Sequence, residues 1–149
     1  AKEYKAKLIG LTISSKGIPQ NKDQRMELAA FIVSYCLENG FSPDSLLLDP
    51  IAMPVNVAQS QQIDILESIR DFKLISEPSP KTIIGLSNVS QGSSNRPLIN
   101  RTFLTMALSY GLDCAILDPL DKELLNSTLT SEIILNRQIY CDKFLEARK

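Results

Sequence analysis

Four short apolar runs recur along this sequence of 149 residues, and each ends on a polar side chain. Near-continuous apolar runs of this length are typical of parallel strands that are buried on both faces. Helix signals separate the runs at the spacing of strand–helix units. This repeat predicts strands at Lys7–Ile13, Ser45–Asp49, Thr82–Asn88 and Cys114–Asp118, with polar ends at Thr12, Asp49, Asn88 and Asp118.

Capping residues mark where the intervening helices begin and end. Asn21 followed by Gln24 resembles a capping box, and Gly40 supplies a left-handed residue after the helix. Apolar residues recurring every three positions predict a second helix across 63–72. Pro97 and Gly111 bound a third helix. A fourth helical region is expected to start at Asp121, to break near Thr128–Ser131 and to continue to Phe144.

Strands that alternate with helices form a parallel sheet through right-handed crossovers. Two α/β architectures fit four such units: a doubly wound sheet and half of a (β/α)₈ barrel. The first strand is not followed by a glycine-rich phosphate loop, and polar residues stand at every strand end. We therefore predict parallel (β/α) units that form the C-terminal half, strands five to eight, of a (β/α)₈ TIM barrel. The chain begins at Ala1 without an initiator Met, so we expect residues 1–149 to be part of a longer protein whose N-terminal half is absent here.

Composition excludes several functional classes. The net charge is −1 with basic and acidic residues interspersed, so nucleic acid is not an expected partner. No apolar run approaches the ~20 residues of a membrane span, and no signal peptide is visible, which predicts a cytoplasmic protein. Cys36, Cys114 and Cys141 lie far apart, so no metal site is expected. With no histidine, any chemistry must use carboxylates, amides, hydroxyls and lysines.

Asp49 and Asn88 are the main candidates for binding or catalysis. Asp49 either accepts N–H groups of a heterocyclic ligand or caps amides of its own loop. Asn88 either donates to a ligand nitrogen or forms an Asx-type turn. Asp121 is better explained as a helix cap than as part of a second carboxylate site with Asp118.

Four further candidate positions surround Asn88 in the sequence. Gly85 would let a flat ring approach the backbone, with Ser87 on the same strand face. Gln91 and Arg96 lie on the following loop and could frame one pocket.

Several segments together resemble a known family. They are Leu8-Ile-Gly-Leu-Thr12 with Lys16-Gly-Ile-Pro19, Asp49-Pro50 with Pro54-Val-Asn-Val-Ala-Gln59, Pro80-Lys-Thr-Ile-Ile-Gly-Leu-Ser-Asn-Val-Ser-Gln91, Asn95-Arg-Pro-Leu-Ile-Asn-Arg-Thr-Phe-Leu104, Tyr110-Gly-Leu-Asp113 and Ile134-Leu-Asn with Tyr-Cys-Asp142. The set resembles the methyltetrahydrofolate:corrinoid/iron–sulfur protein methyltransferases, members of the pterin-binding barrel family. The resemblance covers essentially the whole chain.

The resemblance implies transfer of the N5 methyl of methyltetrahydrofolate to the cobalt of a corrinoid carried by a corrinoid (iron–sulfur) protein. It implies that Asn88 is catalytic, through a hydrogen bond to N5, and that Asp49 holds the pterin ring. Gly85, Ser87, Gln91, Arg96 and Ile116 match positions that line the pterin pocket. A homodimer is also expected. The family's other pterin-anchoring Asp and Asn belong to the N-terminal half, so the 149 residues alone are expected to be inactive.

Three alternative interpretations compete with this one. Dihydropteroate synthase carries an Arg-X-His signature, which a chain without histidine cannot contain. The folate domain of a cobalamin-dependent methionine synthase-like enzyme would share the pterin site and the role of Asn88. A non-catalytic pterin-binding or assembly module would bind the pterin without turnover.

Overall fold

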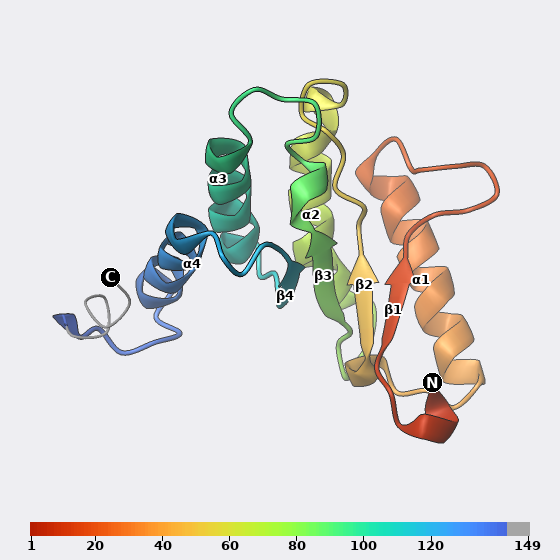
Figure 1. The fold of residues 1–149 in the computed structure, drawn as a ribbon. Helices are drawn as coiled ribbons and strands as arrows, with labels where there is room; N and C mark the ends of the chain where they lie inside the picture. The colour runs from red at the N-terminus through yellow and green to blue at the C-terminus, as the bar shows by residue number, and fades with distance from the viewer. Residues whose placement is uncertain (143–149) are drawn as a thin grey trace.

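Four parallel strands form one sheet in the computed structural model, which describes residues 1–142. They are β1 (Leu8–Leu11), β2 (Leu46–Asp49), β3 (Lys81–Gly85) and β4 (Cys114–Ile116), and they lie in sequential order. The register pairs Leu11 with Asp49 and Gly85 with Ile116. Figure 1 shows the strands running side by side, with the loops after β1, β2 and β3 at one end. The predicted parallel sheet and its strand order are confirmed.

A helix follows each strand. They are α1 (Lys22–Glu38), α2 (Gln62–Asp71), α3 (Arg96–Ser109) and α4 (Lys122–Ile134). None of the described helices is both long and apolar enough to cross a membrane.

The core lies on one face of the sheet, between strands and helices. Leu46 and Leu48 of β2 share an apolar cluster with residues of α1 and with Phe72, and Ile84 of β3 shares a second cluster with α2 and α3. Gly10 of β1 faces the same way, because a Cβ there would lie 3.0 Å from Cγ2 of Ile32 in α1. The helices therefore cover the face to which these alternate strand residues point.

The opposite face of the sheet, here called the open face, carries apolar side chains that remain exposed. Ile9 and Leu11 of β1 are 45% and 51% exposed, and Ile116 of β4 is 61% exposed. Leu47 and Ile83 in the two central strands are buried. The open face is thus an apolar strip that is accessible mainly along its two outer strands.

The predicted helix boundaries rest on the expected capping groups. The Asn21 side chain accepts a hydrogen bond from Gln24 N, and Asp121 accepts one from Leu124 N. Gly40 and Gly111 follow α1 and α3 with φ angles of 65° and 93°, where glycine avoids the steric cost of a Cβ. The interpretation of Asp121 as a helix cap is confirmed.

Helix α4 corrects the predicted break near Thr128–Ser131. The helix is continuous over Lys122–Ile134. Within it, the hydroxyls of Thr128 and Ser131 donate to the carbonyls of Leu124 and Ser127, one turn earlier. It ends at Ile134 and does not continue through residues 135–141. Phe144, the expected end, lies outside the described residues.

Candidate functional site

The carboxyl ends of the four strands meet at one end of the sheet, because all four strands are parallel. Thr12 follows β1, Asp49 is the last residue of β2, and Asp118 comes two residues after β4. Leu11 pairs with Asp49, so their side chains point to the same face. Since side chains alternate along a strand, Asp49 shares that face with Gly85 and with its partner Ile116. These three candidate residues therefore belong to the open face.

Asp49 is held on both its main chain and its side chain. Its carbonyl accepts two hydrogen bonds from Thr12, from N at 3.1 Å and from Oγ1 at 2.9 Å. One carboxylate oxygen, Oδ1, accepts from the backbone N of Ile51 at 2.8 Å. Within residues 1–142, the bond from Ile51 is the side-chain hydrogen bond that Asp49 accepts, and Oδ2 takes no part in it. The cap interpretation explains one oxygen of this carboxylate and leaves the other for a ligand.

Burial raises the pKa of the Asp49 carboxyl above its ordinary value, and the Ile51 N–H acts in the opposite direction. A half-buried carboxylate with one unused oxygen is a strong acceptor for N–H groups. Because its pKa is raised, this carboxylate becomes protonated at a higher pH than a surface aspartate does.

Asn88 does not end a strand, which corrects the predicted strand Thr82–Asn88. β3 ends at Gly85, and Leu86–Asn88 form a 3-10 turn. Leu86 in the turn and Val89 directly after it are both buried. For the same reason Ser87 is not on a strand face with Gly85. The chain turns here because Leu86 and Val89 both reach the core.

The Asn88 amide lies over Gly85. A Cβ at residue 85 would be 3.4 Å from Nδ2 of Asn88, and the Cβ direction there is the open face. The main-chain carbonyl of Asn88 accepts from Gln91 N, whereas its side chain makes no hydrogen bond within the described residues. The amide therefore does not form an Asx turn and can bond to a ligand.

Two contacts connect the loops that carry Asp49 and Asn88. The backbone N of Val55 donates to the carbonyl of Val89 at 2.8 Å. Gly92, with a φ of 75°, approaches Asn56 so closely that a Cβ there would lie 2.9 Å from its Nδ2. The two loops thus form one connected rim.

Ser87 and Arg96 lie together, but in a separate cavity of about 310 Å³ whose wall also includes Asp118 and Asp121. Arg96 donates to the Ser87 carbonyl at 3.2 Å and to the Ser90 hydroxyl at 3.1 Å. The guanidinium therefore braces the turn that carries Asn88. The side chain of Gln91 is exposed and does not line this cavity, so the two predicted pocket residues Gln91 and Arg96 are not brought into one pocket.

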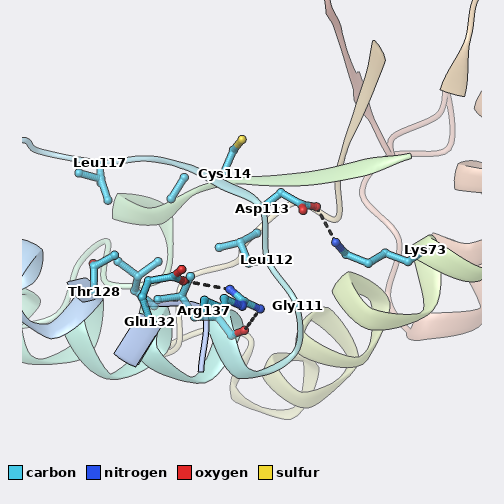
Figure 2. Close-up of a pocket in the computed structure, with 12 residues that line it drawn as sticks. Lys73, Gly111, Leu112, Asp113, Cys114, Leu117, Thr128, Glu132 and Arg137 are labelled. Carbon is cyan, nitrogen blue, oxygen red and sulfur yellow. Dashed lines mark hydrogen bonds and ion pairs between the residues drawn. The ribbon is translucent and has the colours of Figure 1, made fainter. Parts of the chain in front are cut away.

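A larger cavity of about 550 Å³ opens near the start of β4, away from these strand ends (Figure 2). Its charged side chains are already paired. Lys73 Nζ lies 2.8 Å from Asp113, and Arg137 bonds to Glu132 at 3.0 Å and to the Leu108 carbonyl at 3.1 Å. These pairs connect elements of the fold and leave no charge directed at a ligand.

Sequence reasoning did not single out Arg25. This side chain is fully buried in α1, where Nε donates to the Pro50 carbonyl at 2.9 Å and Nη2 to Gln61 Oε1 at 3.0 Å. A signal was present, since Arg25 stands four and eight residues before Ala29 and Val33 on the buried stripe of the helix. No cluster of three potential metal-ligating side chains occurs within residues 1–142.

Comparison with known proteins identifies a distant homologue. The chain is 25% identical over 140 residues to a methylcorrinoid:tetrahydrofolate methyltransferase of Eubacterium limosum. The matched region covers 94% of the chain and 51% of that protein, so the chain spans about half the length of this curated relative. No protein-family profile matches the chain. The predicted resemblance is confirmed as distant homology to a methyltransferase.

Proposed function

We propose that this chain is the C-terminal half of a pterin-binding (β/α)₈ barrel whose activity is methyl transfer between N5 of tetrahydrofolate and the cobalt of a corrinoid. The distant homologue supports the reaction class, because its name describes a methyltransferase acting between these two substrates. The chemistry of the strand ends supports a site for the folate. The observation that carries the proposal is the free amide of Asn88 beside Gly85 on the face that also bears Asp49.

The sheet itself supports the half-barrel. Strand order runs from β1 to β4 without reversal, whereas a doubly wound sheet reverses its order at a switch point. The helices cover one face and the open face is apolar, as the interior of a barrel is. Four more units, about the length by which the relative exceeds this match, would close the barrel.

Within this site Asp49 would accept hydrogen bonds from the N–H groups of the pterin through its unused Oδ2. Gly85 would let the flat ring lie against the backbone, and Ile116, paired with Gly85, would contribute apolar surface beside it. Ser87 and Gln91 remain proposed pocket residues. Arg96 would act on the pocket by holding the turn of Ser87 and Asn88.

Asn88 would act on the reacting nitrogen. A neutral tertiary amine is a poor leaving group, so N5 needs electrostatic support as its bond to the methyl carbon breaks. Methyl transfer to cobalt(I) consumes one proton at N5 and yields tetrahydrofolate and methylcobalt(III). The reverse reaction, in the direction that the relative's name states, releases that proton. An amide serves both directions, because it strengthens its hydrogen bond without changing protonation.

The corrinoid would arrive as a substrate on a second protein. The 142 described residues offer no cluster of metal ligands that would hold a metal of their own. The substrate named for the distant homologue supports a corrinoid protein as the proposed partner. A homodimer stays a prediction.

Methyltetrahydrofolate titration followed by single-turnover methyl transfer to a reduced corrinoid protein tests the proposal in the full-length protein. We expect saturable binding that depends chiefly on Asp49 and methyl transfer that depends chiefly on Asn88. Binding without any transfer would instead favour a pterin-binding module. Absence of folate binding would contradict both.

A further inference from the structure

Arg25 is a buried cation without a carboxylate partner among the described residues. It is 0% exposed, and its hydrogen bonds go to a main-chain carbonyl, that of Pro50, and to the neutral side chain of Gln61. The remaining nitrogen, Nη1, is buried without a hydrogen-bond partner in residues 1–142. Burial lowers the pKa of this guanidinium, while the charge of Asp64 opposes the effect. Burying a charge in this way is costly, and an apolar side chain of similar size would avoid the cost.

The carbonyl that Arg25 holds belongs to the peptide between Pro50 and Ile51. Because a trans peptide is planar, its C=O and its N–H point in opposite directions. Fixing the Pro50 oxygen toward Arg25 therefore aims the Ile51 N–H the other way. That N–H donates to Oδ1 of Asp49 at 2.8 Å.

The peptide needs such a hold because Ile51 is strained. Ile51 has a φ of 62°, in the left-handed region that β-branched side chains rarely adopt. Without an external hold, an isoleucine would return to negative φ. Where that relaxation occurs by rotation of the Pro50–Ile51 peptide plane, the N–H turns away from the Asp49 carboxylate.

We propose that Arg25 is a positioning residue for Asp49: it fixes the Pro50–Ile51 peptide so that Ile51 N–H holds Oδ1 and leaves Oδ2 directed at the ligand. The inference rests on the proposed function only in taking that ligand to be the folate. Thr12 fixes the Asp49 main chain from the other side. Arg25 therefore helps to orient the carboxylate from α1, without contacting the ligand itself.

Titration with methyltetrahydrofolate tests this role in four variants of the full-length protein: Arg25→Met alone, Arg25→Met with Ile51→Gly, Lys22→Met and Asp49→Asn. Arg25→Met should weaken folate binding by roughly three- to tenfold, which corresponds to losing part of the strength of one charged hydrogen bond. The single-turnover rate at saturating folate should change much less. Arg25→Met combined with Ile51→Gly should restore most of the affinity, because glycine adopts positive φ without an external hold.

Lys22→Met is the matched control. Lys22 also lies in α1 and also ties that helix to α2, through Glu67 at 3.0 Å and Asp71 at 3.3 Å, but it does not touch the Pro50 peptide. It should lower the melting temperature without changing folate affinity. If Arg25→Met does not fold, Arg25→Lys, which keeps the charge and loses the Nε geometry, is compared with and without Ile51→Gly in the same way.

The outcomes separate the two proposals. Unchanged affinity in Asp49→Asn would contradict the proposed folate site itself. Weak binding by Asp49→Asn with normal binding by the Arg25 variants would overturn only the positioning role. Weak binding by Arg25→Met that Ile51→Gly fails to restore would also overturn it, because the loss would then reflect general destabilisation.

Discussion

The side-chain nitrogen of Asn88 lies 3.4 Å from the point that a Cβ on Gly85 would occupy. The two residues belong to different local structures, a 3-10 turn and the last position of β3, yet they meet over the open face. This contact defines where a flat ligand would have to lie. It also makes the roles of the two residues separable by substitution.

Asn88→Ala should slow methyl transfer by roughly 10²–10³, the usual loss for one preorganised transition-state donor. Folate affinity should change far less, because the hydrogen bond strengthens only as N5 loses the methyl group. Single-turnover rates at saturating folate measure the effect. Asn95→Ala, which removes an exposed amide that makes no capping bond before α3, is the control. A wild-type rate for Asn88→Ala would contradict the assigned role.

Gly85→Ala should fold normally, because its methyl group would meet Asn88 at an ordinary contact distance. The methyl group would nevertheless occupy space that the ring needs, so folate affinity should fall by at least roughly tenfold, about 1.4 kcal/mol. Calorimetric titration and thermal unfolding of the same samples measure both quantities.

Gly10→Ala supplies the opposite pattern on the helix-covered face. Its Cβ would lie 3.0 Å from Ile32, so overpacking should cost about 1–3 kcal/mol of stability without affecting folate affinity directly. If both alanine variants bound folate alike, the open face would not be the binding face.

Folate affinity should fall on acidification at a pH above the range expected for an ordinary aspartate. Burial raises the pKa of Asp49, and only its ionised form accepts hydrogen bonds with both oxygens. Asp49→Asn should weaken binding and remove this acidic limb. Dissociation constants measured across pH test the expectation, and an unchanged limb in the variant would assign the titration to another group.

The same residue should oppose stability at neutral pH. A carboxyl whose pKa is raised by folding binds its proton more tightly in the folded state, so its contribution worsens as pH rises through the folded pKa. Asp49→Asn should therefore raise the melting temperature near pH 7, because the amide still accepts from Ile51 N. A lower melting temperature would show that the ionised carboxylate has a stabilising partner.

Asp113 should act in the opposite sense. Partial burial favours a higher pKa for this carboxyl, but bonds from Lys73 and Thr82 outweigh it and hold the pKa below its ordinary value. Its stabilisation is then present above the unfolded pKa and is lost as pH falls through the folded pKa. Asp113→Asn should cost roughly 1–3 kcal/mol near neutral pH and little in strong acid. Equal losses at both pH values would contradict the linkage.

The 149-residue chain alone should self-associate and bind folate poorly. Ile9, Leu11 and Ile116 leave apolar surface exposed on the outer strands, and unpaired parallel edges favour further pairing. Sedimentation of the chain tests this, with Ile9→Lys as a variant expected to weaken association. A monomer with full folate affinity would show that these four units suffice.

The sequence predicted the repeating architecture well, because strand periodicity and helix caps are local signals. Asn21, Gly40 and Asp121 act within a few residues of where they stand. It failed where a long-range contact decides the local structure. Val89 reaches the core and turns the end of the predicted third strand into a 3-10 turn.

The hydroxyl-rich segment 128–131 also led to a wrong prediction. Thr128 and Ser131 suggested a break, yet each bonds back along its own helix. At the rim, the residue types of Asp49 and Asn88 were visible in sequence, but their supports were not. Arg25 contacts Pro50, which lies 25 residues later in the sequence. The positive φ of Ile51 cannot be recognised from the sequence.

The bond from Val55 N to the Val89 carbonyl has a consequence for engineering. The loop after β2 and the loop after β3 share this bond and the close approach of Gly92 to Asn56, so neither has an independent shape. Transplanting one of them from a relative would leave a buried donor or acceptor without its counterpart on the other. Loop grafts that aim to change substrate choice should therefore exchange both loops together, so that the contacting residues of each loop come from the same protein.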